Sequence, residues 1–142
     1  MPAPRRAGAT LIDLAVAIAV LCVLGAVVVP RLYTTVDRLR VRTAARRVAA
    51  AYAVAREGAI FRAAFVALEI DAPAGTVTVA AGADTLLHLP LGAELGVALR
   101  TTRTRSVFSP LGLGWGAANA TVVIERRGAA DTVTVSRLGR VR

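Results

Sequence analysis

The feature that most constrains this chain is an apolar stretch from Ala9 to Val29 that contains a single charged side chain, Asp13. A helix of this length crosses about 30 Å of hydrocarbon. A carboxylate inside a bilayer costs roughly 2.5–3.5 kcal/mol on insertion scales, so a group of opposite charge is expected to neutralise it. The chain is therefore expected to start in a membrane, with a partner for Asp13.

Residues 1–8, MPAPRRAG, form a short basic leader that ends in Gly8. Arg5 and Arg6 favour a cytoplasmic leader and export of the remainder. An ordinary secretory signal fits poorly, because the apolar stretch exceeds a typical core of about 7–15 residues and no A-x-A-like site bounded by polar residues follows it. The paired arginines of a Tat signal precede a shorter and less apolar segment. A plain membrane anchor remains an alternative.

The arrangement resembles the class III signal of type IV pilins and type II secretion pseudopilins, in which a basic leader, a glycine and a near-terminal glutamate precede a long apolar helix with a proline. The matching positions are Gly8, Thr10, Leu11, Ile12 and Pro30, while Asp13 stands where the family has Glu and Ala9 where it has Phe. The resemblance implies a prepilin peptidase that cuts between Gly8 and Ala9, followed by N-methylation of Ala9.

The resemblance also implies an assembly role for Asp13 and Pro30. The carboxylate would meet the new amino terminus of the next protomer and fix register, since both charges lie out of water. Asp13 as a helix-start carboxylate favoured by the macrodipole is the simpler alternative. Pro30 would provide a bend for packing in a filament, or only a helix breaker at the lipid interface.

Beyond Pro30, apolar side chains recur every three or four residues, which is typical of an amphipathic helix. These positions are Leu32, Val36, Leu39, Thr43, Val48, Tyr52, Ala55 and Ala59, with Ala44 and Ala51 beside them. Arg38, Arg42 and Arg46 lie on another face. Thr10 to about Arg62 thus predicts one helix about 80 Å long, bent or locally melted at Pro30.

The remainder alternates with the period of two that indicates β-strands. The predicted strands are Phe65–Asp71, Thr76–Ala80, Thr85–Leu89, Val97–Thr101, Thr121–Arg126 and Thr132–Ser136, and the turns include Gly75, Gly92 and the stretch from Ser109 to Gly116. A long helix followed by such strands predicts an α+β, pilin-like fold with an antiparallel sheet on the second half of the helix. The expected segments are a leader (1–8), a transmembrane and assembly half-helix (9–30), an amphipathic half-helix (31–62) and a β-rich periplasmic domain (63–142).

The C-terminal part resembles the GspH/FimT group of minor pseudopilins and pilins. The similar segments are Ala55–Asp71, Phe108–Gly114, Val122–Glu125 and Val133–Val141. Residues 72–107 match only in character. This resemblance implies a structural subunit rather than an enzyme, with no cofactor.

The chain is strongly basic: all 18 basic residues are arginine against nine acidic residues, and the formal net charge of +9 becomes +7 once Arg5 and Arg6 leave with the leader. Such a surface can meet phosphate, anionic lipid or an acidic partner. Some FimT-like pilins bind DNA through a C-terminal Gly-Arg-x-Arg, which Gly139, Arg140 and Arg142 match. Arg103 and Arg105 are further candidates, although runs of arginine are commonly only solvated.

The remaining reactive side chains predict no catalytic or metal site. His88 lies between leucines in a predicted strand without nearby ligands, and the serines lack a motif that pairs them with a base. Cys22 is expected to be a small buried apolar residue, and Trp115 a loop residue that covers the sheet.

The sequence thus predicts a minor pseudopilin of a type II secretion system, close to the pseudopilus tip. It would lie in the bacterial inner membrane as a single-pass protein with a periplasmic domain. Its partners would be other pseudopilins or pilins, the prepilin peptidase and the inner-membrane assembly platform. The alternative is a FimT-like minor pilin of a type IV pilus that binds DNA for uptake.

Overall fold

The structure, a computed structural model, describes residues 10–116, 119–136 and 140–142, without the side chains of Val27 and Pro30. The chain divides into two compact units, Met1–Thr35 and Val36–Arg142. A single helix, α1 (Leu11–Arg62), begins in the first unit and ends in the second. It continues through residue 30, so the expected local melting is absent there.

In the first unit, α1 presents apolar side chains on all sides. The exposed fractions run from 86 % at Leu11 to 47 % at Val29. Cys22 is also exposed rather than buried as expected, because nothing within this single unit covers the helix. A helix that is hydrophobic all round requires lipid or other protein around it.

In the second unit, one face of α1 is buried. Its members are Asp37, Val41, Ala44, Ala45, Val48, Ala51, Tyr52, Ala55 and Ala59. The predicted face is confirmed from Ala44 onward and wrong before it: Leu32, Val36, Leu39 and Thr43 are exposed. The prediction followed the larger apolar side chains. The buried face instead begins at a charged residue, Asp37, because Arg126 of a distant strand neutralises it.

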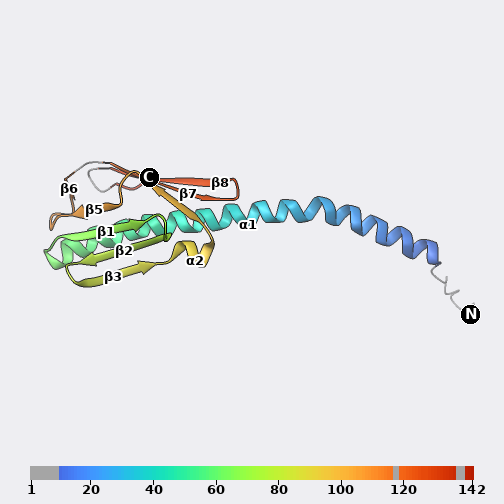
Figure 1. Ribbon diagram of the computed structural model, residues 1–142, viewed down its shortest axis with the longest axis horizontal. Coiled ribbons are helices and arrows are strands. Elements are labelled where there is room, and N and C mark those ends of the chain that lie inside the picture. Colours follow the sequence, from blue (N-terminus) through green and yellow to red (C-terminus); the bar gives the residue numbers. More distant parts are fainter. Residues whose placement is uncertain (1–9, 117–118, 137–139) are drawn as a thin grey trace, which may run out of the picture. The chain divides into compact units, whose positions relative to one another are not determined.

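Two antiparallel sheets cover this face of α1 (Figure 1). The five-stranded sheet has the order β3-β2-β1-β5-β6 and the three-stranded sheet the order β4-β7-β8. The elements are β1 (Val66–Asp71), β2 (Thr76–Ala81), β3 (Asp84–Leu89), α2 (Leu91–Leu95), β4 (Ala98–Thr101), β5 (Arg105–Phe108), β6 (Gly114–Trp115), β7 (Ala120–Arg126) and β8 (Ala129–Val135). All six predicted strands are present, and α2, β5 and β6 are additional.

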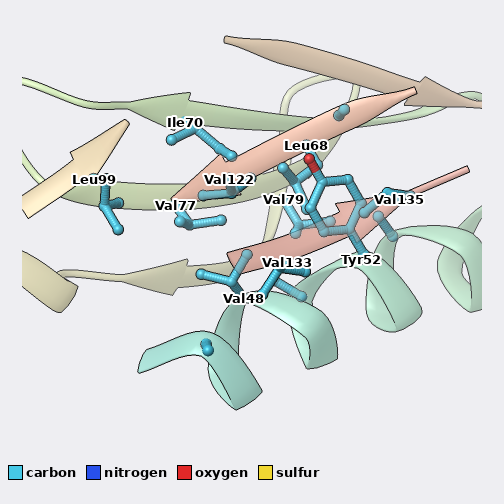
Figure 2. Close-up of a cluster of buried hydrophobic side chains, with 14 of the residues drawn as sticks. Val48, Tyr52, Leu68, Ile70, Val77, Val79, Leu99, Val122, Val133 and Val135 are labelled. Carbon is cyan, nitrogen blue, oxygen red and sulfur yellow. The ribbon is translucent and has the colours of Figure 1, made fainter. Parts of the chain in front are cut away.

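The core lies between α1 and the two sheets (Figure 2). Val48 and Tyr52 come from the helix, Leu68 from the larger sheet and Val122 from the smaller one, and each is at most 1 % exposed. Burying a side chain of this size contributes about 1.5–3 kcal/mol. The small residues Ala44, Ala51, Ala55 and Ala59 let the strands approach the helix, which explains the alanine-rich face.

The turn between β1 and β2 is tied to the start of α2 by a close backbone contact. The Gly92 N–H donates to the Gly75 carbonyl oxygen at 2.9 Å. Gly75 has φ +66°, and a Cβ there would lie 2.8 Å from Gly92 Cα. Both the left-handed conformation and the contact therefore require glycine at this turn.

Candidate assembly site and basic surfaces

The start of α1 holds Asp13 in a capping box with Thr10. Asp13 Oδ2 accepts hydrogen bonds from the Thr10 N–H and the Thr10 hydroxyl, both at 2.9 Å. The Asp13 N–H in turn donates to Thr10 Oγ1 at 3.3 Å. This reciprocal arrangement satisfies helix-start donors that have no partner within the helix, so the helix-start alternative for Asp13 has a structural basis.

The capping box does not use the whole carboxylate. Both bonds that Asp13 accepts end on Oδ2, and no described residue donates to Oδ1. Asp13 is exposed among apolar neighbours such as Leu11 and Leu14. One carboxylate therefore can cap its own helix and still accept a cationic amine from another protomer.

Other predicted assembly residues are less fully described. Gly8 and Ala9 lie outside the described residues, and only the backbone of Pro30 is described. By length and composition, α1 is capable of crossing a membrane, and the apolar window that qualifies has no buried residue.

In the second unit, Arg126 is a structural residue rather than a free cation. Its Nε donates to Asp37 Oδ1 at 2.6 Å. A second guanidinium nitrogen, Nη1, donates to the carbonyl oxygens of Leu95 and Gly96, each at 2.7 Å. The two charged side chains are only 13 % and 10 % exposed. Sequence reasoning assigned Arg126 only to the end of a predicted strand, and the lone Asp37 among many arginines was the available signal for this pair.

The candidate DNA-binding arginines Arg103 and Arg105 line one hollow, whereas Arg142 lines another. Arg105 Nε lies 3.3 Å from Glu69 Oε1, so its charge is partly neutralised. Arg103 donates from Nε to the Asn119 carbonyl oxygen at 3.3 Å, and it has no ion pair among the described residues. Both line a hollow of about 180 Å³ with Tyr52.

The C-terminal arginines lie on a short strand-like segment beside β8. The Arg142 N–H and C=O both bond to Thr134 at 2.8 Å, and the Ser136 N–H donates to the Arg140 carbonyl oxygen at 2.9 Å. Val141 packs against the core. Because side chains alternate along a strand, Arg140 and Arg142 share the outward face, and both are exposed. Gly139 lies outside the described residues.

Arg142 belongs to a second basic hollow, separate from that of Arg103. This hollow of about 200 Å³ lies between α1 and β8, and its charged lining residues are Arg42, Arg46, Arg142 and Asp131. The structure therefore groups C-terminal and helical arginines that are far apart in the sequence, which sequence reasoning had not brought together.

The β5–β6 hairpin carries an exposed apolar surface. Trp115, placed in a loop by the sequence prediction, instead ends β6, and its ring meets Phe65 edge-on with a centroid distance of 5.2 Å. These two rings and Leu113 help to line a hollow of about 490 Å³. Trp115 remains 66 % exposed, so it covers the sheet only in part.

The single histidine has a structural environment. His88 lies in β3, is exposed, and has its Nδ1 3.0 Å from Thr78 Oγ1, which confirms the expected strand residue. Within the part of the chain that the structure describes, no three His, Cys, Asp or Glu side chains form a group able to hold a metal.

A long N-terminal helix whose second half packs against antiparallel sheets is the fold of type IV pilin-like proteins. The family model described as type II transport protein GspH matches residues 44–139, and the chain belongs to this family. The family and the apolar helix together indicate a membrane-anchored component of a pilus or pseudopilus.

Two solved structures of minor subunits share the fold. The type IV minor pilin FimU of Pseudomonas aeruginosa has 17 % identity and a TM-score of 0.63, with 75 % of this chain and 89 % of that chain covered. The minor pseudopilin EpsH of the Vibrio cholerae type 2 secretion system has 16 % identity and a TM-score of 0.57, with 72 % and 94 % covered. Among curated proteins, no match is found.

Proposed function

We propose that this protein is a minor pseudopilin of a type II secretion system, a structural subunit near the tip of the periplasmic pseudopilus. The observation that carries the proposal is the half-used carboxylate of Asp13 at the start of an uncovered apolar helix. Membership of the GspH family supports it. The protein would work by association rather than by catalysis.

Maturation would create the partner for Asp13. Cleavage between Gly8 and Ala9 by the prepilin peptidase frees an amine, and N-methylation of Ala9 leaves it cationic. In the next protomer, this amine would approach Asp13 Oδ1. Two charges out of water require each other, so the pair selects one register between neighbouring helices.

The close packing of apolar helices would follow from small side chains. Ala15, Ala17 and Ala19 interrupt the larger residues along the first unit of α1. In lipid, small residues allow the close approach on which helix association depends. The second unit would then extend from the inner membrane into the periplasm, where it can contact other minor pseudopilins or cargo.

The mature N terminus tests the proposal directly. Mass spectrometry of the protein from its native membrane is expected to find methylated Ala9 as the first residue, and a Gly8 variant with a bulky side chain is expected to remain uncut. An intact Met1 in the native protein would remove the pseudopilin assignment.

Three substitutions separate the charge of Asp13 from its capping bond. Asp13→Asn keeps a side-chain acceptor for the cap but loses the charge, and it is expected to be inserted and cleaved yet poorly incorporated in filament cross-linking. Thr10→Ala weakens the cap but keeps the charge, so near-normal incorporation is expected. Asp13→Glu, which restores the usual family residue, is the positive control. Equal incorporation of Asp13→Asn and the wild type would show that capping alone suffices.

A second candidate function is DNA binding by a FimT-like minor pilin. The supporting observation is that Arg140 and Arg142 share one exposed face fixed by backbone bonds to β8. Duplex retardation by the full chain in detergent, measured over a salt series, tests this alternative. Binding through phosphates would fall with a log–log slope of about −0.9 per phosphate neutralised.

The matched variants for that test keep the backbone pairing. Arg140→Ala with Arg142→Ala removes both outward cations, whereas Arg100→Ala removes an exposed arginine that lies 3.9 Å from Glu125. We expect weak retardation at physiological salt in all forms. Tight, salt-sensitive retardation lost only in the double variant would make DNA binding the function.

A further inference from the structure

β6 is the outer strand of the five-stranded sheet, and no described strand pairs with its other edge, which is called the free edge below. The Ser109 N–H donates to the Leu113 carbonyl oxygen at 2.9 Å. Val107 pairs with Trp115 and Phe108 with Gly114. Bonded and non-bonded pairs alternate along an antiparallel ladder, so Val107 and Trp115 form the next bonded pair. The N–H and C=O of Gly114 therefore point away from β5, toward the free edge.

The two faces of the sheet differ in chemistry at this edge. On the outer face, Trp115 and Phe65 line the apolar hollow of about 490 Å³ together with Leu111 and Leu113. Leu111 is 79 % exposed and Trp115 is 66 % exposed. Large aromatic and aliphatic side chains grouped in this way mark interaction sites.

The smaller hollow of about 180 Å³ extends to the inner face and combines basic and polar groups with apolar ones. Tyr52, Arg103, Arg105, Ser106 and Ser136 line it together with Phe108, the inward-facing partner of Gly114, and it shares Gly114 and Trp115 with the apolar hollow. The Tyr52 ring meets Phe108 edge-on at 6.4 Å. The hydroxyl of Tyr52 points away from α1 toward the strands (Figure 2).

Two polar groups of this inner hollow can each still donate a hydrogen bond to an anion. The Tyr52 side chain is 1 % exposed, and its hydroxyl makes no hydrogen bond of normal geometry with a described residue; the Ser106 side chain interacts with it only weakly. A buried polar group without a partner costs about 1–3 kcal/mol, so such a group calls for an explanation. Arg103 likewise has no ion pair with any described carboxylate. A hydroxyl donor beside an unpaired guanidinium favours a carboxylate.

We propose that the free edge of β6 docks an extended segment of a neighbouring subunit in which apolar and acidic side chains alternate. Successive side chains of a strand point to opposite faces of a sheet. An added strand would hydrogen-bond to Gly114 and direct an apolar side chain to Trp115 and Phe65. The next side chain, a carboxylate, would reach Arg103 and the Tyr52 hydroxyl on the other face.

In this mode of recognition the backbone and the side chains of the added strand have different roles. Main-chain bonds at a sheet edge supply affinity, and the pockets for alternate side chains supply specificity. The inference rests on the proposed function, because it assigns the surface by which the exported domain of a filament subunit contacts its partner.

The single tryptophan gives the experiment its signal. The probes are capped heptapeptides added to the full chain in detergent micelles: one alternates leucine with aspartate, one alternates leucine with lysine, and one groups its leucines and aspartates in two blocks. The alternating acidic peptide is expected to bind, to shift the Trp115 emission to the blue, and to slow hydrogen exchange at the Gly114 amide. The other two peptides are expected to bind at least about tenfold more weakly, since each loses one of the two pockets.

Variants of the full chain test whether the inner hollow binds the acidic side chain of the peptide. Arg103→Glu and Tyr52→Phe are each expected to weaken binding of the acidic peptide about tenfold, through loss of a charge-assisted contact. Arg38→Glu, an exposed arginine on α1, makes the same change of charge elsewhere and is expected to leave binding unchanged. Trp115 emission in the absence of peptide verifies that each variant is folded.

Several results would overturn the inference. If the lysine peptide bound as tightly as the acidic one, the apolar hollow alone would account for binding. If hydrogen exchange at the Gly114 amide did not change, the peptide would not pair with the free edge of β6. A response to single-stranded oligonucleotide but not to peptide would assign Trp115 and Arg103 to nucleic acid. A protein that is cleaved and assembled but binds no peptide contradicts this inference only, whereas one that binds peptide yet retains its leader contradicts the proposed function only.

Discussion

At the scale of single residues, the strongest constraint in the second unit is the buried pair of Asp37 and Arg126. Arg126→Ala would leave the buried charge of Asp37 without its partner. The substitution is therefore expected to lower the free energy of unfolding by about 3–5 kcal/mol. Urea titration of the full chain in detergent, followed by Trp115 fluorescence, measures this. The exposed neighbour serves as control, since Arg127→Ala is expected to change stability by no more than about 0.5 kcal/mol.

A compensating change completes that test. Asp37→Leu combined with Arg126→Met replaces the pair by apolar groups of similar volume, and such replacements are frequently neutral or stabilising. The double variant is therefore expected to recover most of the loss. A single variant as stable as the wild type would contradict the structural role of the pair.

Tyr52 makes stability depend on pH in the alkaline range. Burial raises the pKa of its hydroxyl above the ordinary value of 10.0, with a smaller opposing effect of Ser106. Above pH 10 the unfolded chain therefore loses this proton while the folded chain keeps it, and stability falls as pH rises. Denaturant titrations between pH 8 and about 11 are expected to show this decline, and Tyr52→Phe is expected to flatten it.

The same substitution separates stability from binding. Tyr52→Phe removes a buried hydroxyl that interacts only weakly with Ser106 and makes no hydrogen bond of normal geometry with a described residue. At neutral pH the free energy of unfolding is therefore expected to be unchanged or to rise by about 1 kcal/mol. A loss of peptide binding without a loss of stability would identify a residue retained for recognition. A marked loss of stability would instead show that the hydroxyl has a structural partner.

At the scale of elements, the sequence was informative wherever pattern and burial coincide. The alternation in β1, β2 and β7 predicted strands within a residue of their ends, because one face of each is buried. The pattern could not reveal β6, since two residues carry no periodicity and a strand so short exists only through pairing with β5. Nor could it locate Asp37 in the core, because the arginine that neutralises it comes from β7.

The candidate sites also include local groupings, which the sequence shows, and long-range groupings, which it does not. Thr10 and Asp13 are three residues apart, so their capping box is local and readable from sequence. The hollows of Tyr52 with Arg103, and of Arg42 with Arg142, bring together residues that are distant in the chain. Such groupings depend on sheet order, which single-sequence patterns do not encode.

The C-terminal segment protects the edge of β8. Arg142 exchanges two backbone bonds with Thr134, and Val141 packs on the core. A chain shortened by residues 140–142 exposes an unpaired strand edge, which is a template for association with other chains. We expect this truncation to cause concentration-dependent self-association in sedimentation experiments. Arg142→Ala keeps the backbone bonds and should sediment as the wild type does, and identical behaviour of the truncated chain would contradict the edge-covering role.

At the scale of the whole molecule, most acidic side chains of the second unit pair with arginines, whereas Asp13 lies in the apolar stretch. Five acidic side chains, Asp37, Glu69, Asp84, Glu94 and Glu125, each lie near an arginine in the second unit. Four of these pairs are exposed, and such pairs contribute little to stability. With nine acidic residues against 18 arginines, a large positive excess remains for partners outside the chain. Asp13 is the acidic residue of the apolar stretch, and the proposed assembly role would give it a fixed cation from another protomer.

The two units also differ in what they need from their surroundings, and this difference gives the last prediction. Every buried core residue lies between Val41 and Val135, whereas the large apolar side chains described before Leu32 are exposed. A fragment of residues 31–142 retains the complete core and the Asp37–Arg126 pair, so it is expected to fold without detergent. Its thermal midpoint should lie within about 4 °C of the full chain in micelles, which corresponds to less than about 1 kcal/mol. A fragment of residues 50–142 loses Val41 and Val48 from the core and is expected not to fold. Circular dichroism of both fragments measures the outcome. A longer fragment that folds only in detergent would show that the apolar half of α1 takes part in the folding of the second unit.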